Sequence, residues 1–475
     1  MSIYQDLAAS LKKSISNYQL LKGEKLPPTR LLANDLGISR STVLKAYDIL
    51  CIEKYVTAIQ GSGYFVEDIQ LRKMQLPSHS SGKKSARPEI SKRARNFKQY
   101  VNLMNRTGNK GIAFRPGLPP LDIFPIRQWQ QLTNNYWKKV TFSEMSYGAP
   151  LGIESLRKNI ADYLRIYRNI QCDFEQVVVV TGSLHSLSMV GDLLLDEGDQ
   201  VVIENPTYAN ALAIFRSLKA QLVPAEIDKE GLSIKSINQK KLTKPKLVYT
   251  TPSNQYPSGV QMSMERRIEL LDWAREQNCL IIEDDYDHEF SNWEKPITSI
   301  FGLDKTDSVI YQGTFNKLLH PSIRLGYLIV PPYLIDDIRA AYEQTLRFVS
   351  PATQKVMSSF IEKNYLSTHL RKVIEVSNDR RAFFTEEFYK HFGDNIALSD
   401  TNKGLHLIAH LTDADDVLLS QHLDKHGITV FPYSKYFFKG NKPSGLVMGF
   451  SSVEKSVIKT KVAEMSRLYF GFSEA

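Results

Sequence analysis

Apolar runs that end in polar or reactive side chains recur through the C-terminal part of this 475-residue chain. The side chains that follow these runs comprise a small-residue turn, an aromatic ring, carboxylates, a phenol, a hydroxyl, an amine and a guanidinium. They are Gly182-Ser183, Tyr208, Asp284, Asp285, Tyr286, Thr314, Lys317 and Arg324. Because the carboxyl ends of neighbouring parallel strands meet at one edge of an open sheet, we expect these groups to share one binding site.

Pyridoxal 5′-phosphate (PLP) is the cofactor that requires this set of groups. A lysine forms a Schiff base with it, a carboxylate keeps its pyridine nitrogen protonated, and a helix N-terminus with a cation binds its phosphate. Asp284 and Tyr286 lie two residues apart on an extended segment, so they point to the same side. The pattern predicts a PLP site, with Asp285 left open as an alternative to Asp284.

The elements that must position these groups begin after a basic stretch. Residues 71–110 hold eleven basic side chains and one acidic one, and they account for the net charge of +9 of the whole chain. Ser, Pro, Gly and Lys replace the hydrophobic periodicity there, which predicts a flexible linker over residues 70–110. Such a stretch either binds a polyanion such as nucleic acid or is a solvated, self-repelling spacer.

Two domains of different class are expected on either side of this linker. Residues 111–475 alternate strand-like runs with helical patterns, which predicts an α/β domain with a mostly parallel sheet in three layers, α/β/α. Residues 1–69 predict three helices and a small hairpin, in which Thr29 and Ser39 are expected N-caps and Gly37 ends the second helix. The expected buried face of the third helix comprises Val43, Ala46, Tyr47 and Leu50.

The order of helix, helix-turn-helix and hairpin wing, with the stretch from Leu26 to Tyr47, resembles the winged-helix domain of GntR-type bacterial regulators. The resemblance implies that one face of this domain contacts operator DNA, with the wing tip near the minor groove. The residues implied are Arg30, Ser39, Arg40, Thr42, Lys45, Gly61 and Gly63. A helix N-terminus and basic side chains suit phosphates and base edges. Gln60 precedes the wing glycines where relatives often carry Arg, so the basic linker is expected to add phosphate affinity.

The C-terminal domain resembles a fold-type-I aminotransferase, and the whole chain resembles the MocR/GabR family of regulators. Three stretches, residues 251–259, 281–287 and 313–321, follow the family motifs almost residue for residue. The resemblance implies Lys317 as the Schiff-base lysine, Asp284 at the pyridine nitrogen and Tyr286 at the ring 3′-oxygen. It further implies that Tyr208 stacks on the ring, and that the phosphate is held by Ser183, Leu184, Thr314, Arg324 and the partner subunit's copy of Tyr147.

The pattern departs from active aminotransferases at the substrate carboxylate. Such enzymes bind it with a C-terminal arginine, whose planar guanidinium matches a carboxylate, but residues 445–452 contain no Arg. Amino-acid-sensing relatives place arginines where this chain has Asn210 and Lys435, and Lys435 is the remaining candidate for an effector carboxylate. Asn316 and Asn254 also stand where Ser and His are usual.

These features predict a DNA-binding regulator that senses PLP itself and controls vitamin B6 synthesis or salvage, without efficient transamination. The alternatives are a regulator that responds to a GABA-like or taurine-like amino acid through an external aldimine, and an active aminotransferase with a DNA-binding head. The resemblance also implies a homodimer, arranged head-to-tail, that reads two half-sites.

Cysteine usage and hydropathy indicate the compartment. The chain has three widely spaced cysteines, no Cys/His cluster with metal-ligand spacing, and no run near the roughly 18 apolar residues of a membrane helix. We therefore expect a soluble, cytoplasmic protein without a disulfide framework, a metal or a membrane partner.

Overall fold

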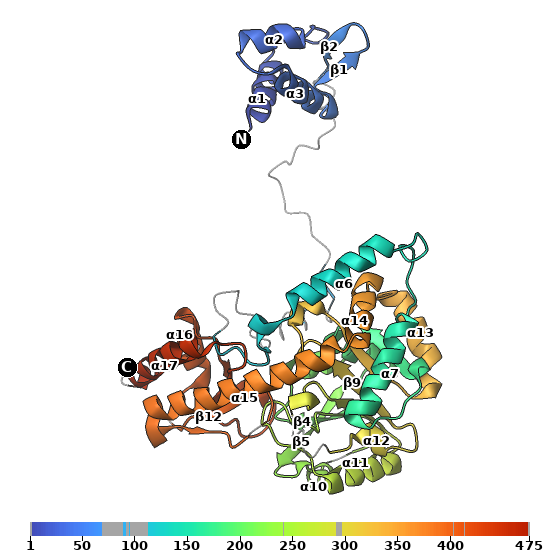
Figure 1. The fold of residues 1–475 in the computed structure, drawn as a ribbon, viewed down its shortest axis with the longest axis vertical. Helices are drawn as coiled ribbons and strands as arrows, with labels where there is room; N and C mark the ends of the chain where they lie inside the picture. Colours follow the sequence, from blue (N-terminus) through green and yellow to red (C-terminus); the bar gives the residue numbers. More distant parts are fainter. Residues whose placement is uncertain are drawn as a thin grey trace. The chain divides into compact units, whose positions relative to one another are not determined.

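The structure is a computed structural model that describes residues 2–68, 89–91, 95, 113–240, 242–290, 297–401, 403–412 and 414–473. The chain divides into two compact units, Met1–Glu89 and Ile90–Ala475 (Figure 1). Most of the predicted linker lies outside the described residues, so the boundaries 1–69, 70–110 and 111–475 stay predictions.

The N-terminal unit has the expected order of elements. It comprises α1 (Ile3–Ser16), α2 (Thr29–Asp35), α3 (Arg40–Ile52), β1 (Val56–Ile59) and β2 (Gly63–Val66). Ser39 caps α3 as predicted, since its hydroxyl accepts the backbone N–H of Thr42 at 3.1 Å. The predicted buried face of α3 is confirmed, because Val43, Ala46, Tyr47 and Leu50 are all 0% exposed. The antiparallel hairpin pairs Val56 with Val66.

The predicted N-cap at Thr29 is wrong. The cap position of α2 is Pro28, whose ψ of 138° already supplies the extended conformation that a helix entry needs, and Thr29 is the first helical residue. The hydroxyl of Thr29 instead accepts a bond from Arg40 Nε at 3.4 Å. The predicted end of α2 is confirmed, since Gly37 has a left-handed φ of +63° just after the helix.

A mixed, mostly parallel sheet forms the centre of the C-terminal unit, as the sequence predicts. In the described residues its strand order is β3-β10-β9-β8-β7-β4-β5-β6, and only β10 and β6 run against the others. The strands are β3 (Val177–Val180), β4 (Gln200–Asn205), β5 (Gln221–Asp228), β6 (Gly231–Leu232), β7 (Pro245–Thr250), β8 (Leu280–Asp284), β9 (Val309–Thr314) and β10 (Gly326–Ile329). The carboxyl ends of β3, β9, β8, β7 and β4 therefore meet at one edge of the sheet.

Helices cover both faces of this sheet and make the three predicted layers. Alternate strand residues point to opposite faces, so Tyr249 and Ile282 join the core with α8 and α9, whereas Val248 and Ile281 join the core with α10 and α11. Figure 1 shows α10 and α11 together along their face. These helices are α8 (Ser183–Leu194), α9 (Ala209–Ser217), α10 (Ile234–Asn238) and α11 (Met264–Gln277). The other helices of this region are α6 (Ile126–Lys139), α7 (Glu154–Arg168), α12 (Ile300–Leu303), α13 (Ile335–Thr345) and α14 (Pro351–Glu362).

A smaller antiparallel sheet completes the C-terminal unit. Its order is β11-β12-β14-β13, with β11 (Ala397–Leu398), β12 (His406–His410), β13 (Phe431–Pro432) and β14 (Gly445–Gly449). It packs against α15 (Tyr365–Phe392), α16 (Asp416–Lys425) and α17 (Lys455–Ser473) around a core that contains Phe384, Phe388 and Met448. In Figure 1 the long helix α15, in orange, extends from beside α14 to this smaller subdomain.

The first described segment of the C-terminal unit joins both subdomains. Ala113 pairs with Ile428 of the smaller subdomain, and the carbonyl of Phe114 accepts the backbone N–H of Gly449 at 2.7 Å. The carbonyl of Gly117 then reaches Lys317 of the larger one.

The described part of the chain can be examined for disulfides and for membrane-spanning helices. Cys51, Cys172 and Cys279 are all free in the structure. No helix among the described residues combines the length and the apolar character that crossing a membrane requires.

The core of the N-terminal unit gives a matched pair of substitutions. Leu50→Ala removes a side chain that is 0% exposed and is expected to destabilise this unit by about 2–5 kcal/mol through the cavity that it leaves. Leu31→Ala, at a position that is 53% exposed, is expected to change the free energy of unfolding by no more than about 0.5 kcal/mol. Hydrogen exchange of the α3 amides in the full-length chain measures both, and equal effects would contradict the described core.

Candidate functional site

A cavity of about 630 Å³ opens at the carboxyl edge of the large sheet. Eight of the nine residues predicted for the cofactor line it. They are Ser183, Leu184, Tyr208, Asp284, Tyr286, Thr314, Lys317 and Arg324. The parallel strands therefore bring together groups that are up to 141 positions apart in the sequence, from Ser183 to Arg324.

Lys317 follows β9 and lies in the wall of this cavity. Its Nζ donates a hydrogen bond to the carbonyl oxygen of Gly117 at 2.8 Å and lies 5.9 Å from the centroid of the Tyr286 ring. Burial lowers the pKa of Lys317, while the negative charges of Asp287 and Asp284 act to raise it. An enclosed amine with a lowered pKa is more readily deprotonated, which is what a nucleophilic lysine needs.

The adjacent carboxylates of Asp284 and Asp285 have opposite surroundings. Asp284 lines the cavity and accepts a hydrogen bond from Tyr249 Oη at 2.7 Å, and burial raises its pKa to about 6. Asp285 accepts bonds from Arg168 Nε at 2.7 Å and Tyr311 Oη at 2.6 Å. Burial acts to raise the pKa of Asp285, but the charge of Arg168 helps to hold it below its ordinary range. The geometry thus favours Asp284 for the role that the sequence left open.

Three tyrosines form an aromatic wall of the cavity. The ring of Tyr256 lies edge-on to those of Tyr208 and Tyr286, with centroids 5.7 Å and 5.8 Å away. Asn210, which stands where sensing relatives have arginine, donates its amide to Tyr208 Oη at 2.6 Å. Burial raises the pKa of Tyr208 to about 12, so this phenol stays neutral at ordinary pH. The wall is apolar on its ring faces and suits a flat aromatic ligand.

The groups at the start of α8 are suited to binding a phosphate-sized anion. Gly182, with a left-handed φ of +114°, precedes the helix, and the first-turn amides of Ser183 and Leu184 accompany it. A Cβ placed on Gly182 would lie 3.6 Å from the guanidinium of Arg324 and 3.5 Å from the amide of Asn316. The positive end of a helix and a guanidinium therefore lie beside the same glycine, as anion binding requires.

Two of the sequence departures lie close to these groups. Asn316 lines the cavity, and its buried Oδ1 has no hydrogen-bond partner among the described residues. Asn254 donates its side-chain amide to Asp287 at 2.7 Å, and its backbone carbonyl accepts the hydroxyl of Tyr286 at 3.0 Å. A buried amide oxygen without a partner is costly, so it indicates a cavity built to receive a polar ligand.

Several residues that line the cavity were not predicted from the sequence. Arg115, Gly117, Tyr249 and Tyr256 all line the cavity. The available signal for the first two was the turn-forming stretch Arg115-Pro116-Gly117 at the start of the domain, where Gly117 has φ +75° and a Cβ would collide with Lys317 Nζ. Tyr249 ends a strand beside those already considered, but only the sheet order places it next to Asp284.

Two predicted residues are not brought to the cavity within this chain. Lys435 is exposed and does not line it, and Tyr147 is 78% exposed and packs edge-on against Phe348. The predicted role of Tyr147 is in a partner subunit, so this position stays a prediction. Lys435 likewise stays a prediction, without geometric support from this chain.

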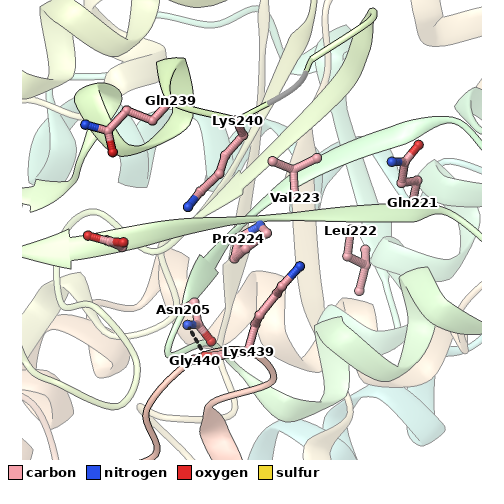
Figure 2. Close-up of a pocket in the computed structure, with 10 residues that line it drawn as sticks. Asn205, Gln221, Leu222, Val223, Pro224, Gln239, Lys240, Lys439 and Gly440 are labelled. Atoms are coloured by element: carbon pink, nitrogen blue, oxygen red, sulfur yellow. Dashed lines mark hydrogen bonds between the residues drawn. The ribbon is translucent and has the colours of Figure 1, made fainter.

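A second cavity, of about 400 Å³, lies over β5. Figure 2 shows Lys240 and Lys439 reaching toward the strand from opposite sides of it. None of the predicted site residues lines this cavity. Its rim includes the loop around Lys439, which Asn205 holds by donating to the carbonyl of Lys439 at 2.9 Å and accepting from Phe438 N at 3.1 Å.

The predicted DNA-contacting side chains lie on the outside of the N-terminal unit. Arg30 of α2 and Arg40 and Lys45 of α3 are exposed, as are Ser39 and the wing glycine Gly61, while Thr42 and Gly63 are half-buried. Among the described residues, Arg40 contacts only the hydroxyl of Thr29, and Lys45 lies 5.7 Å from the ring centroid of Tyr4. These cations are available to a polyanion.

Known proteins match both units. Residues 3–66 match the family "Bacterial regulatory proteins, gntR family", and residues 128–444 match "Aminotransferase class I and II". The probable rhizopine catabolism regulatory protein MocR of Rhizobium meliloti is 31% identical over 474 residues, which cover 100% of this chain and 95% of that protein. The chain belongs to the MocR/GabR family of transcription regulators.

Two further similarities of this MocR/GabR-family protein bear on its ligand. The HTH-type pyridoxine biosynthesis transcriptional regulator PdxR of Corynebacterium glutamicum is 26% identical and matches 98% of this chain and 95% of its own length. The structure of Pyrococcus horikoshii kynurenine aminotransferase in complex with PMP has a TM-score of 0.72 and 25% identity, and covers 81% of this chain and 98% of that one. The C-terminal unit is thus a fold-type-I aminotransferase domain, and PLP is its cofactor.

The residues of this regulator fit PLP. When bound, PLP supplies an aldehyde that reacts with a lysine amine and a pyridine ring that withdraws electrons. Lys317 would supply the amine, and Asp284 would hold a proton at the pyridine nitrogen, where its neighbour Tyr249 keeps the carboxylate in place. Tyr208 would cover the ring face, and Arg324 with the first turn of α8 would neutralise the phosphate.

The two neighbouring carboxylates are expected to respond differently to neutralisation. Asp284→Asn is expected to weaken PLP binding at least about tenfold, because the pyridine nitrogen loses its charged partner. Asp285→Asn is expected to destabilise the regulator by roughly 3–5 kcal/mol, because Arg168 is left buried without a counter-charge. A spectrophotometric PLP titration and urea unfolding of each variant test this, and an exchange of the two phenotypes would contradict the assignment.

The raised pKa of Asp284 also predicts a pH dependence of stability. The pKa of its carboxyl rises from an ordinary value of 3.8 to about 6 on folding. Between these pH values the folded PLP-free chain therefore binds more protons than the unfolded chain does. Asp284 therefore costs stability above pH 6, by about 3 kcal/mol, and the cost disappears below pH 4. The gain in Tm from Asp284→Asn is expected to be larger at pH 8 than at pH 5, and a gain independent of pH would contradict the burial of this carboxylate.

Proposed function

We propose that this regulator binds operator DNA through its winged helix and that occupancy of the C-terminal cavity by PLP changes this binding. PLP is then the sensed ligand, and genes of vitamin B6 synthesis or salvage are the proposed targets. The observation that carries the proposal is the cavity itself, in which amine, carboxylate, aromatic and phosphate-binding groups are all present. The 26% identity to a pyridoxine biosynthesis regulator supports the choice of pathway.

The absence of one enzymatic group supports a sensing role over turnover. Residues 445–452, which include β14, carry no arginine for a substrate carboxylate. A sensor needs only to bind its ligand, whereas a transaminase must also orient an amino acid against the cofactor for proton transfer. We therefore propose that the chain lacks efficient transaminase activity.

The contact between Lys317 and Gly117 offers a route from the cavity to the linker. The amine of Lys317 donates to the Gly117 carbonyl at 2.8 Å, and Gly117 belongs to the segment that follows residues 70–110. An amine engaged by a ligand no longer makes the same hydrogen bond. Ligand binding can shift DNA binding only if it favours one arrangement of this segment over another, and this contact provides such a difference.

A homodimer, arranged head-to-tail, is part of the proposal. Apolar side chains of α6 and the loop after it are unusually exposed, with Phe142 at 91%, Tyr147 at 78% and Trp137 at 57%. Exposed apolar groups of this size support burial against a second copy. Two copies would place two winged helices on two half-sites of an operator.

A regulator that also responds to an amino acid is the second candidate. The observation that favours it is that Arg115 lines the same cavity, because a guanidinium is suited to a carboxylate.

The proposed function predicts that PLP changes DNA affinity through Lys317. Duplex DNA enriched from a random library by the full-length protein is expected to bind the PLP-loaded and PLP-free forms with affinities that differ about 5- to 150-fold. Lys317→Ala is expected to lose both the visible absorbance of lysine-bound PLP and the response of DNA binding. Arg40→Ala is the matched control, which is expected to weaken DNA binding in both forms and to keep the absorbance. Equal DNA affinity of the loaded and PLP-free forms would sink the proposal.

A further inference from the structure

Residues 445–452, which include β14, contain no arginine for a substrate carboxylate, and another segment of this chain lies against the end of β14. The backbone N–H of Gly449, the last residue of β14, donates to the carbonyl of Phe114 at 2.7 Å. A Cβ on Gly449 would collide with the carbonyl oxygen of Arg115 and lie 2.9 Å from Pro116 Cα. Glycine at this position therefore allows the segment 114–117 to pack directly on the strand end.

Arg115 belongs to this segment and lies in the wall of the cavity. It lines the cavity together with Lys317, Tyr208 and Tyr256, and it is half-buried. Two residues later, the carbonyl of Gly117 accepts the amine of Lys317 at 2.8 Å. The backbone that holds Arg115 is thus fixed at one side by β14 and at the other by the cofactor-binding lysine.

The guanidinium of Arg115 has no hydrogen-bond or ion-pair partner among the residues that the structure describes. The arginines that are fully buried in the described part of the domain are paired, as Arg168 is with Asp285 and Arg380 is with Asp122. A half-buried guanidinium that lines a cavity and lacks a counter-charge is a binding group for an anion. The phosphate of PLP has separate groups at the start of α8, so Arg115 remains available for a second anion.

We propose that Arg115 binds the carboxylate of a small molecule that enters the cavity beside PLP, in place of the arginine that β14 lacks. The ligand class is an amino acid, because a carboxylate meets the guanidinium while an amine faces the atoms around Lys317. This inference rests on the proposed PLP-loaded regulatory site and adds a second ligand to it. It also moves the expected carboxylate anchor from Lys435, which is exposed and outside the cavity, to Arg115.

The planar guanidinium of Arg115 is expected to select a carboxylate over a carboxamide. Arginine donates two parallel N–H bonds to a carboxylate, a geometry that an amide of the same size cannot accept with equal strength. An amino acid is therefore distinguished from its own carboxamide at this position, although both present the same amine to Lys317. Substitution by lysine keeps the charge but removes the paired geometry.

The test uses the full-length, PLP-loaded regulator and matched pairs of probes. Glycine, L-alanine, β-alanine and 4-aminobutyrate are each titrated against the corresponding amino amide, and the visible absorbance of the bound PLP is followed. At least one acid is expected to act at a concentration roughly tenfold to hundredfold lower than its amide. Arg115→Gln is expected to abolish this preference, and Arg115→Lys is expected to restore it in part.

Two controls separate this inference from the proposed function. Arg467→Gln changes an exposed arginine of α17 and is expected to keep the preference, and PLP loading of every variant is measured before titration. Failure of the unmodified chain to load PLP overturns the proposed function, whereas a loaded chain without acid preference overturns only the role of Arg115. An unchanged preference in Arg115→Gln, or its loss in Lys435→Gln instead, overturns that role as well.

Discussion

The enclosure of the Lys317 amine beside buried carboxylates constrains the rest of the C-terminal domain. Burial lowers the pKa of Lys317, and the charges of Asp287 and Asp284 oppose this. The carboxylate of Asp284 is itself enclosed and is held by Tyr249, so its pKa rises to about 6. Groups that are this costly to bury persist in folded proteins chiefly where a function requires them.

The large sheet positions these buried polar groups. The parallel strands β4, β7, β8 and β9 are buried on both faces by helices, which leaves their carboxyl ends as the place where polar side chains can meet a ligand. A buried ion pair between Arg168 and Asp285 holds the carboxylate that directly follows β8. The sheet thus holds Asp284 on one side of a strand end and a structural carboxylate on the other.

A regulator built on this scaffold can differ from an enzyme in very few groups. Eight of the nine residues predicted to bind PLP line one cavity, whereas β14 ends in Gly449 and leaves room for the segment that carries Arg115. The same segment contacts both subdomains and Lys317. A ligand that bridges these elements would favour one of their arrangements, which is the physical requirement for a change in DNA binding.

The sequence by itself determined both fold classes and the buried face of α3, and it predicted eight of the residues that line the cavity, because alternation, helical spacing and motif order are local properties of the chain. Local pattern could not choose between Asp284 and Asp285, place the cap of α2 at Pro28 or connect Arg115 with β14. Asp285 is distinguished by its ion pair with Arg168, which lies 117 positions earlier, and Arg115 meets Gly449 over a separation of 334 positions. Only the tertiary structure brings such distant residues into contact, because their positions follow from strand order and packing rather than from spacing.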